Sequence, residues 1–111
     1  MSEYIKLPYN DFREMRNVPS RLRAWIDILI HAQEENRTIV YNNQRFQLKR
    51  GQQLTNVRAL QKRWEANDYS PSKLGVMWSL YLLEETGRIT VEKIHPRMIL
   101  ITVCNCELYL S

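Results

Sequence analysis

Basic side chains that can bind phosphate are concentrated in the middle of the chain. Residues 38–73 contain seven Lys or Arg against two Asp or Glu. Residues 1–37 hold six of each sign, and residues 74–111 hold three basic against four acidic residues. The formal net charge of +4 therefore originates in the middle segment. Such an excess favours a polyanionic partner, although an ordinary solvated surface can have the same composition.

Eight residues are the candidates for contact with double-stranded DNA. Arg58 and Lys62 are one helical turn apart, and Lys73 stands where a following helix begins. The start of a helix attracts phosphate, and serine hydroxyls there act as donors unless they are used for capping. Contacts of this kind give affinity without sequence preference. The candidates are Arg58, Lys62, Arg63, Ser70, Ser72, Lys73, Lys93 and Arg97.

Residues 70–87, SPSKLGVMWSLYLLEETG, begin with a serine and a proline and end with a glycine, as helices often do, but they contain few charged residues. At helical spacing one apolar stripe consists of Val76, Leu80 and Leu83. An almost opposite stripe consists of Leu74, Trp78 and Tyr81. A small domain buries one stripe, so the second is expected either to bind a partner or another copy of the chain, or to be covered by the N-terminal segment or the terminal hairpin.

Metal binding and catalysis are not expected. Cys104 and Cys106 lie one residue apart and lack the usual spacing of zinc ligands, and His31 and His95 do not form a second ligand pair in the sequence. There is no glycine-rich phosphate loop and no nucleophile motif. The pair Glu84-Glu85 is interpreted as a solvated helix end. We therefore expect no cofactor and no enzymatic activity.

Local patterns predict three helices and two hairpins. The helices are expected over residues 21–35, over 57–65 and from Ser70 or Ser72 to about residue 85. A first hairpin is expected over 38–41 and 45–48, where Asn tolerates the turn conformation. A second is expected over 89–94 and 98–104, around an exposed His95-Pro96-Arg97 tip.

The order of these elements predicts an α+β winged helix-turn-helix fold. In it, a three-helix bundle with a small N-terminal hairpin is covered by a C-terminal two-stranded wing, and residues 1–111 form a single domain. Such a fold would place helix 57–65 and the wing on phosphates and the start of the next helix near a groove. The absence of a long apolar run, together with cysteines expected to be reduced, favours a soluble cytoplasmic protein.

Four segments of the chain resemble a known family. They are YIKL at 4–7, KRGQQLT at 49–55, LEETGRI at 83–89 and ITVCN at 101–105. In order and spacing they are similar to the N-terminal winged-helix domain of phage and prophage replisome organisers, the DnaD-like replication-initiation proteins. The resemblance implies DNA binding, self-association into a dimer or oligomer, and replication proteins as partners.

The chain departs from the family pattern in three places. Cys106 replaces an aromatic residue, residues 1–111 do not include the helical C-terminal domain of many relatives, and only Lys73 remains of the basic residues usual along the third helix. Two other roles therefore stay open. One is a protein–protein interaction module that uses Leu74, Trp78 and Tyr81, and the other is a transcriptional regulator.

Overall fold

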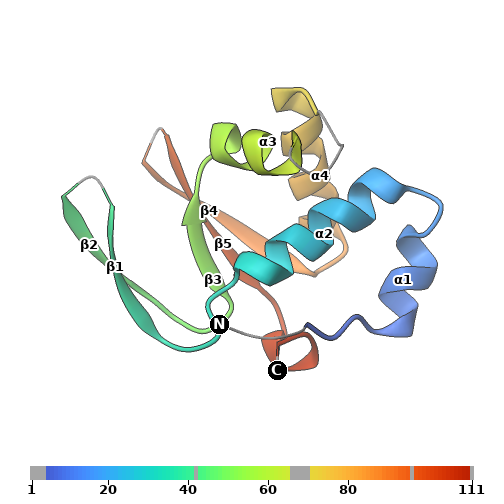
Figure 1. Cartoon of the computed structure of the whole chain (residues 1–111), viewed down its shortest axis with the longest axis horizontal. Helices are drawn as coiled ribbons and strands as arrows, with labels where there is room; N and C mark the ends of the chain where they lie inside the picture. The colour runs from blue at the N-terminus through green and yellow to red at the C-terminus, as the bar shows by residue number, and fades with distance from the viewer. Residues whose placement is uncertain (1–4, 42, 66–70, 96, 111) are drawn as a thin grey trace.

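Helices and strands are interleaved along the chain (Figure 1). The computed structural model describes residues 5–41, 43–65, 71–95 and 97–110. The elements within these ranges are α1 Tyr9–Met15, α2 Pro19–His31, β1 Arg37–Tyr41, β2 Gln44–Leu48, β3 Gln52–Thr55, α3 Val57–Glu65, α4 Lys73–Glu85, β4 Ile89–His95, β5 Met98–Val103 and the 3-10 turn η1 Cys106–Leu108.

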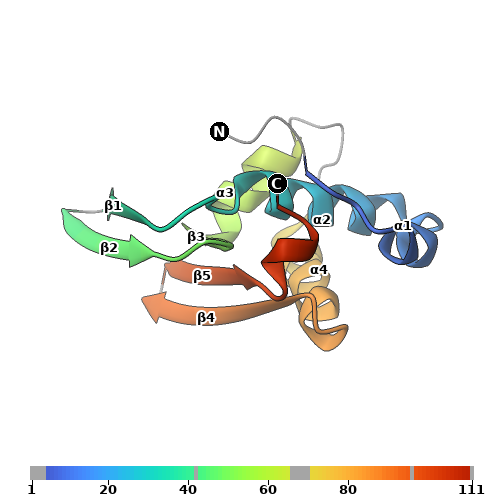
Figure 2. The same cartoon turned by 90° about the horizontal axis from the view of Figure 1, so that it is seen from below.

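The strands form two antiparallel sheets. Strands β1 and β2 make a two-stranded hairpin, whereas the other sheet has three strands in the order β3-β5-β4. Its register sets Ile99 of β5 between Thr55 of β3 and Lys93 of β4. The β1–β2 and β4–β5 hairpins extend toward the same side of the molecule (Figures 1 and 2).

The predicted winged helix-turn-helix topology is wrong. The described residues contain four α-helices instead of three, and the C-terminal hairpin is not a separate two-stranded wing, because β3 pairs with β5 along the whole of Gln52–Thr55. The architecture is α+β, as expected, but it consists of four helices with a two-stranded and a three-stranded sheet.

Strand β3 escaped prediction because its sequence, QQLT, lacks apolar alternation. Gln53 nevertheless occupies the inner face of the sheet, where its side chain is buried. Its Nε2 donates a hydrogen bond to the carbonyl oxygen of Ile28 at 2.9 Å, and its Oε1 accepts one from Arg63 at 3.2 Å. A buried amide is tolerated in a core when both its oxygen and its nitrogen are hydrogen-bonded. Gln53 can therefore take an inward-facing position of the strand that an apolar residue usually holds.

The first long helix, α2, begins and ends earlier than the predicted range 21–35. Pro19 lies in its first turn, where the missing N–H costs no hydrogen bond. The helix ends at His31 because Gln33 then pairs with the chain entering β3. The N–H of Gln33 donates to the carbonyl of Gln52 at 2.9 Å, and the N–H of Gly51 donates back to Gln33 at 2.8 Å.

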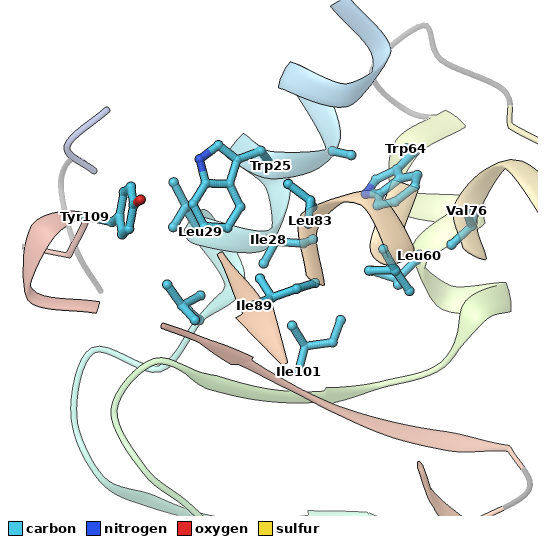
Figure 3. Packing of buried hydrophobic residues seen from close by; sticks show 14 of the residues in the cluster. Trp25, Ile28, Leu29, Leu60, Trp64, Val76, Leu83, Ile89, Ile101 and Tyr109 are labelled. Atoms are coloured by element: carbon cyan, nitrogen blue, oxygen red, sulfur yellow. The ribbon is translucent and has the colours of Figure 1, made fainter. Parts of the chain in front are cut away.

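The hydrophobic core lies between the helices and the three-stranded sheet (Figure 3). Trp25 and Trp64 come from α2 and α3, and both are at most 2% exposed. The sheet contributes Ile89 and Ile101 from neighbouring strands. The ring of Tyr109 packs edge-on against Trp25, with centroids 5.0 Å apart, which fixes the C-terminal segment to the core.

A buried carboxylate, Asp11, joins four parts of the fold. It accepts hydrogen bonds from Trp25 Nε1 at 3.1 Å and from Arg88 Nη2 at 2.9 Å, and it also bonds the Tyr109 hydroxyl. Arg88 forms a second ion pair, with Glu14 at 2.6 Å. Burial opposes the charge of Arg88, but the bonds to the two carboxylates outweigh it and raise the pKa of the guanidinium.

The helices are short compared with a bilayer. The two longest, α2 and α4, have 13 residues each. Within the described part of the chain, no helix has the length and apolar character needed to cross a membrane.

Candidate nucleic-acid interface

A pocket of about 670 Å³ opens between the two hairpins and the first turns of α3 and α4. We call it the hairpin pocket. It receives side chains from the end of β1, the start of α3, the start of α4, and the turn and first residues of β5. Its lining residues are Tyr41, Asn56, Val57, Arg58, Lys73, Arg97, Met98 and Ile99.

Local capping places both helix starts at this pocket. Asn56 directly follows β3, and its Oδ1 accepts a hydrogen bond from the N–H of Ala59 at 2.8 Å, which caps α3. Its Nδ2 donates to the hydroxyl of Tyr41 at 3.2 Å, so the same residue ties the β1–β2 hairpin to α3. Ser72 caps α4 by accepting from the N–H of Gly75 at 3.0 Å.

Three of the predicted DNA contacts converge in the hairpin pocket. Arg58, Lys73 and Arg97 are exposed and come from α3, α4 and the β4–β5 turn. None of the described lining residues is Asp or Glu, so no carboxylate of the lining neutralises them. The positive ends of the α3 and α4 dipoles add to the same potential. The arrangement can therefore bind a phosphate group from several directions.

Lys93 and Lys62 extend this positive surface. Lys93 pairs directly with Ile99, which lines the hairpin pocket, and paired residues of antiparallel strands have their side chains on the same sheet face. Lys62 is exposed on α3 one turn beyond Arg58. Neither residue lines the pocket, but both lie beside it along these elements.

Arg63 points elsewhere. Its guanidinium forms an ion pair with Asp27, a residue only 6% exposed, and bonds Gln53 of β3. Asp27 also accepts a hydrogen bond from Trp64 Nε1 at 2.9 Å, and His31 Nδ1 lies 3.4 Å from its other oxygen. This predicted DNA contact is therefore engaged in an internal network that joins α2, α3 and β3.

The two predicted serines differ in what the structure says of them. Ser72 is exposed at the N-cap of α4 and uses its oxygen as a cap acceptor. A hydroxyl that accepts one hydrogen bond still carries a proton that it can donate. Ser70 lies outside the described residues.

Sequence reasoning missed the uncharged half of the hairpin pocket. Tyr41 is the last residue of β1, and no motif distinguishes it from an ordinary strand residue. Asn56 directly precedes the predicted helix 57–65, where an asparagine is an ordinary helix cap and indicates no binding role. The convergence of Val57, Met98 and Ile99 depends on the pairing of β3 with β5, which the polar sequence of β3 concealed.

The second stripe of α4 is exposed. Val76, Leu80 and Leu83 are buried, as predicted. On the opposite side, Trp78 is 60% exposed and stacks on Tyr81 with ring centroids 5.4 Å apart. We define the outer face of α4 as the exposed apolar residues Leu74, Met77, Trp78 and Tyr81.

Neither segment proposed to cover this face does so in the described residues. Ile5 forms a bridge with Leu110, and the N–H of Lys6 donates to the carbonyl of Tyr109 at 2.7 Å. The described N-terminal segment therefore packs beside η1 and the core (Figure 1). The start and end of the outer face also differ in charge, because Lys73 begins α4 whereas Glu84 and Glu85 end it.

Comparison of the chain with protein-family models, with curated proteins and with solved structures found no match.

Proposed function

We propose that this protein binds DNA through the hairpin pocket and the surface beside it. The observation that carries the proposal is the convergence of Arg58, Lys73 and Arg97 from three separate elements, with no carboxylate among the described lining residues. Three cations lining one pocket repel one another, and a bound anion would offset this repulsion.

The proposed binding mode is electrostatic. The three pocket cations contact phosphates, Lys62 and Lys93 extend the contact along α3 and β4, and the Ser72 hydroxyl adds a neutral donor at the start of α4. Contacts to phosphates fix position and supply affinity, but they do not read sequence. We therefore propose binding with little sequence preference.

The test is the salt dependence of binding to a duplex. With five cationic contacts, a plot of log affinity against log salt concentration is expected to have a slope of about −4.5. Fluorescence anisotropy with a labelled duplex between about 50 and 200 mM salt measures this slope. Unmeasurable binding at the lowest salt concentration would contradict the proposal.

A role in phage or prophage replication initiation, with replication proteins as partners, is part of this proposal. It is supported by the four segments that resemble replisome organisers and not by the architecture, which differs from the fold expected of them. Transcriptional regulation would use the same phosphate contacts, so gene neighbourhood is the simplest observation that separates the two roles.

Self-association through the outer face of α4 is a second candidate function. Trp78, Met77 and Leu74 are between 55% and 76% exposed along one side of a single helix. A two-fold axis across this face would run two copies of α4 antiparallel. Lys73 of each copy would then approach Glu84 and Glu85 of the other, so charge and apolar character are both self-complementary.

A further inference from the structure

The hairpin pocket has an apolar part that phosphate binding does not require. Val57, Met98 and Ile99 line it together with the ring of Tyr41. Ile99 and Tyr41 are half-buried, and each comes from a different sheet. A surface that only tracks the outside of a duplex needs cations and polar donors, so these apolar side chains require another explanation.

The dimensions of the pocket favour a single nucleotide over a duplex. At about 670 Å³ it falls within the range of roughly 300–1,000 Å³ that is typical of pockets for small ligands. A DNA duplex presents its bases only in its grooves and is far too wide to enter. An unpaired nucleotide has the matching chemistry, because its base offers apolar faces and its phosphates are anionic.

Tyr41 is held in position to contact a base. Its hydroxyl accepts the hydrogen bond from Asn56 Nδ2, and Asn56 is itself fixed as the cap of α3. The ring therefore stays in the wall of the pocket that Val57 and the cation Arg58 also line. An aromatic ring next to cations is the combination by which proteins bind single strands without reading their sequence.

We infer that the hairpin pocket receives one unpaired nucleotide of single-stranded DNA, its base against Tyr41 and the apolar wall of Val57 and Ile99, its flanking phosphates on Arg58, Lys73 and Arg97. This inference rests on the proposed DNA binding and specifies the form of DNA. The protein thus prefers single-stranded ends or junctions to a continuous duplex.

The test compares three labelled DNA molecules at one salt concentration: a thymidine oligonucleotide, a blunt duplex, and the same duplex with a thymidine tail. The wild-type chain is expected to bind the single strand and the tailed duplex about tenfold more tightly than the blunt duplex, the contribution of one base–aromatic contact. Tyr41→Ala removes this preference, whereas Tyr41→Phe retains it because the ring remains.

Matched variants keep the result interpretable. Tyr9→Ala truncates a tyrosine on α1, away from the pocket, and is expected to bind like the wild type. Thermal unfolding checks that each variant folds. Tyr41→Leu replaces Tyr41→Ala if the alanine variant does not fold, because leucine keeps apolar bulk on the hairpin without a stacking ring.

The outcomes separate this inference from the proposed function. Blunt duplex bound as tightly as the single strand would overturn the inference and leave DNA binding in place. A preference that survives Tyr41→Ala, or Tyr41→Leu where it replaces the alanine variant, would do the same. Failure to bind all three DNA molecules would overturn both. Single-stranded RNA bound about tenfold more tightly than DNA would overturn the assignment to DNA.

Discussion

At the scale of single residues, this protein uses its arginines in two different ways. Arg63 and Arg88 reach buried aspartates and hold elements together. Arg58 and Arg97 are exposed at the rim of a pocket whose described lining lacks a carboxylate. Sequence position does not distinguish the two groups, because Arg63 is only five residues from Arg58 on the same helix. The two groups are distinguished by the residues that surround each arginine in the fold.

Arg63→Gln tests this division. The variant leaves Asp27 without its guanidinium partner, so the free energy of unfolding is expected to fall by about 1–3 kcal/mol, as measured by urea denaturation. The affinity of the folded variant for DNA and its salt slope are expected to stay unchanged. A lower salt slope with unaltered stability would show that Arg63 contacts phosphate, as the sequence predicted.

Tyr109 gives the fold a specific dependence on alkaline pH. Burial, with a hydrogen bond to Asp11, raises its pKa from 10.0 to about 12. Because the folded pKa is the higher one, its stabilising contribution is complete below pH 10 and is lost as pH rises toward about 12. The difference in unfolding free energy between the wild type and Tyr109→Phe should therefore shrink across this interval. A difference independent of pH would contradict this role.

At the scale of elements, the sequence predicted α3, which depends on local interactions, but missed β3, which depends on a distant strand. The range of α3 was predicted at 57–65, and the structure gives Val57–Glu65, because its apolar spacing and its cap, Asn56, are local in the sequence. Strand β3 was missed because its reason for being a strand is pairing with β5, some fifty residues later. The cationic half of the hairpin pocket was predictable from residue type, whereas its apolar half depends on that pairing.

The outer face of α4 is exposed in the single chain, and Trp78→Glu tests whether this face mediates self-association. The substitution places a charge on the outer face of α4 without touching the core, so folding is expected to persist. The dissociation constant of the dimer, measured by sedimentation equilibrium, is expected to increase about tenfold or more.

The matched control for this element is Ile30→Glu, which changes a similarly exposed side chain, 59% against 60%, on α2. It is expected to associate like the wild type. A wild-type chain that is monomeric at high concentration would remove the self-association proposal. If both variants weakened dimerisation equally, the interface would not be specific to the outer face of α4.

At the scale of the whole molecule, charge is sorted by position. Two aspartates, Asp11 and Asp27, are buried in ion pairs, and Glu84 and Glu85 stand at the far end of α4 from Lys73. The two hairpins extend on one side of the molecule (Figure 2). Residues of both hairpins line the hairpin pocket. Under the proposed function, this distribution of charge would orient an approaching polyanion toward the hairpin pocket.

The central claim, that the hairpin pocket is the DNA-binding surface, is tested most directly by a comparison of two charge-matched variants. One carries Arg58→Gln, Lys73→Gln and Arg97→Gln in the pocket. The other carries Lys6→Gln, Arg13→Gln and Arg16→Gln, which are exposed on or beside α1. Loss of three phosphate contacts should reduce the salt slope from about −4.5 to about −2 in the first variant and leave it unchanged in the second. Equal slopes in the two variants would contradict the claim.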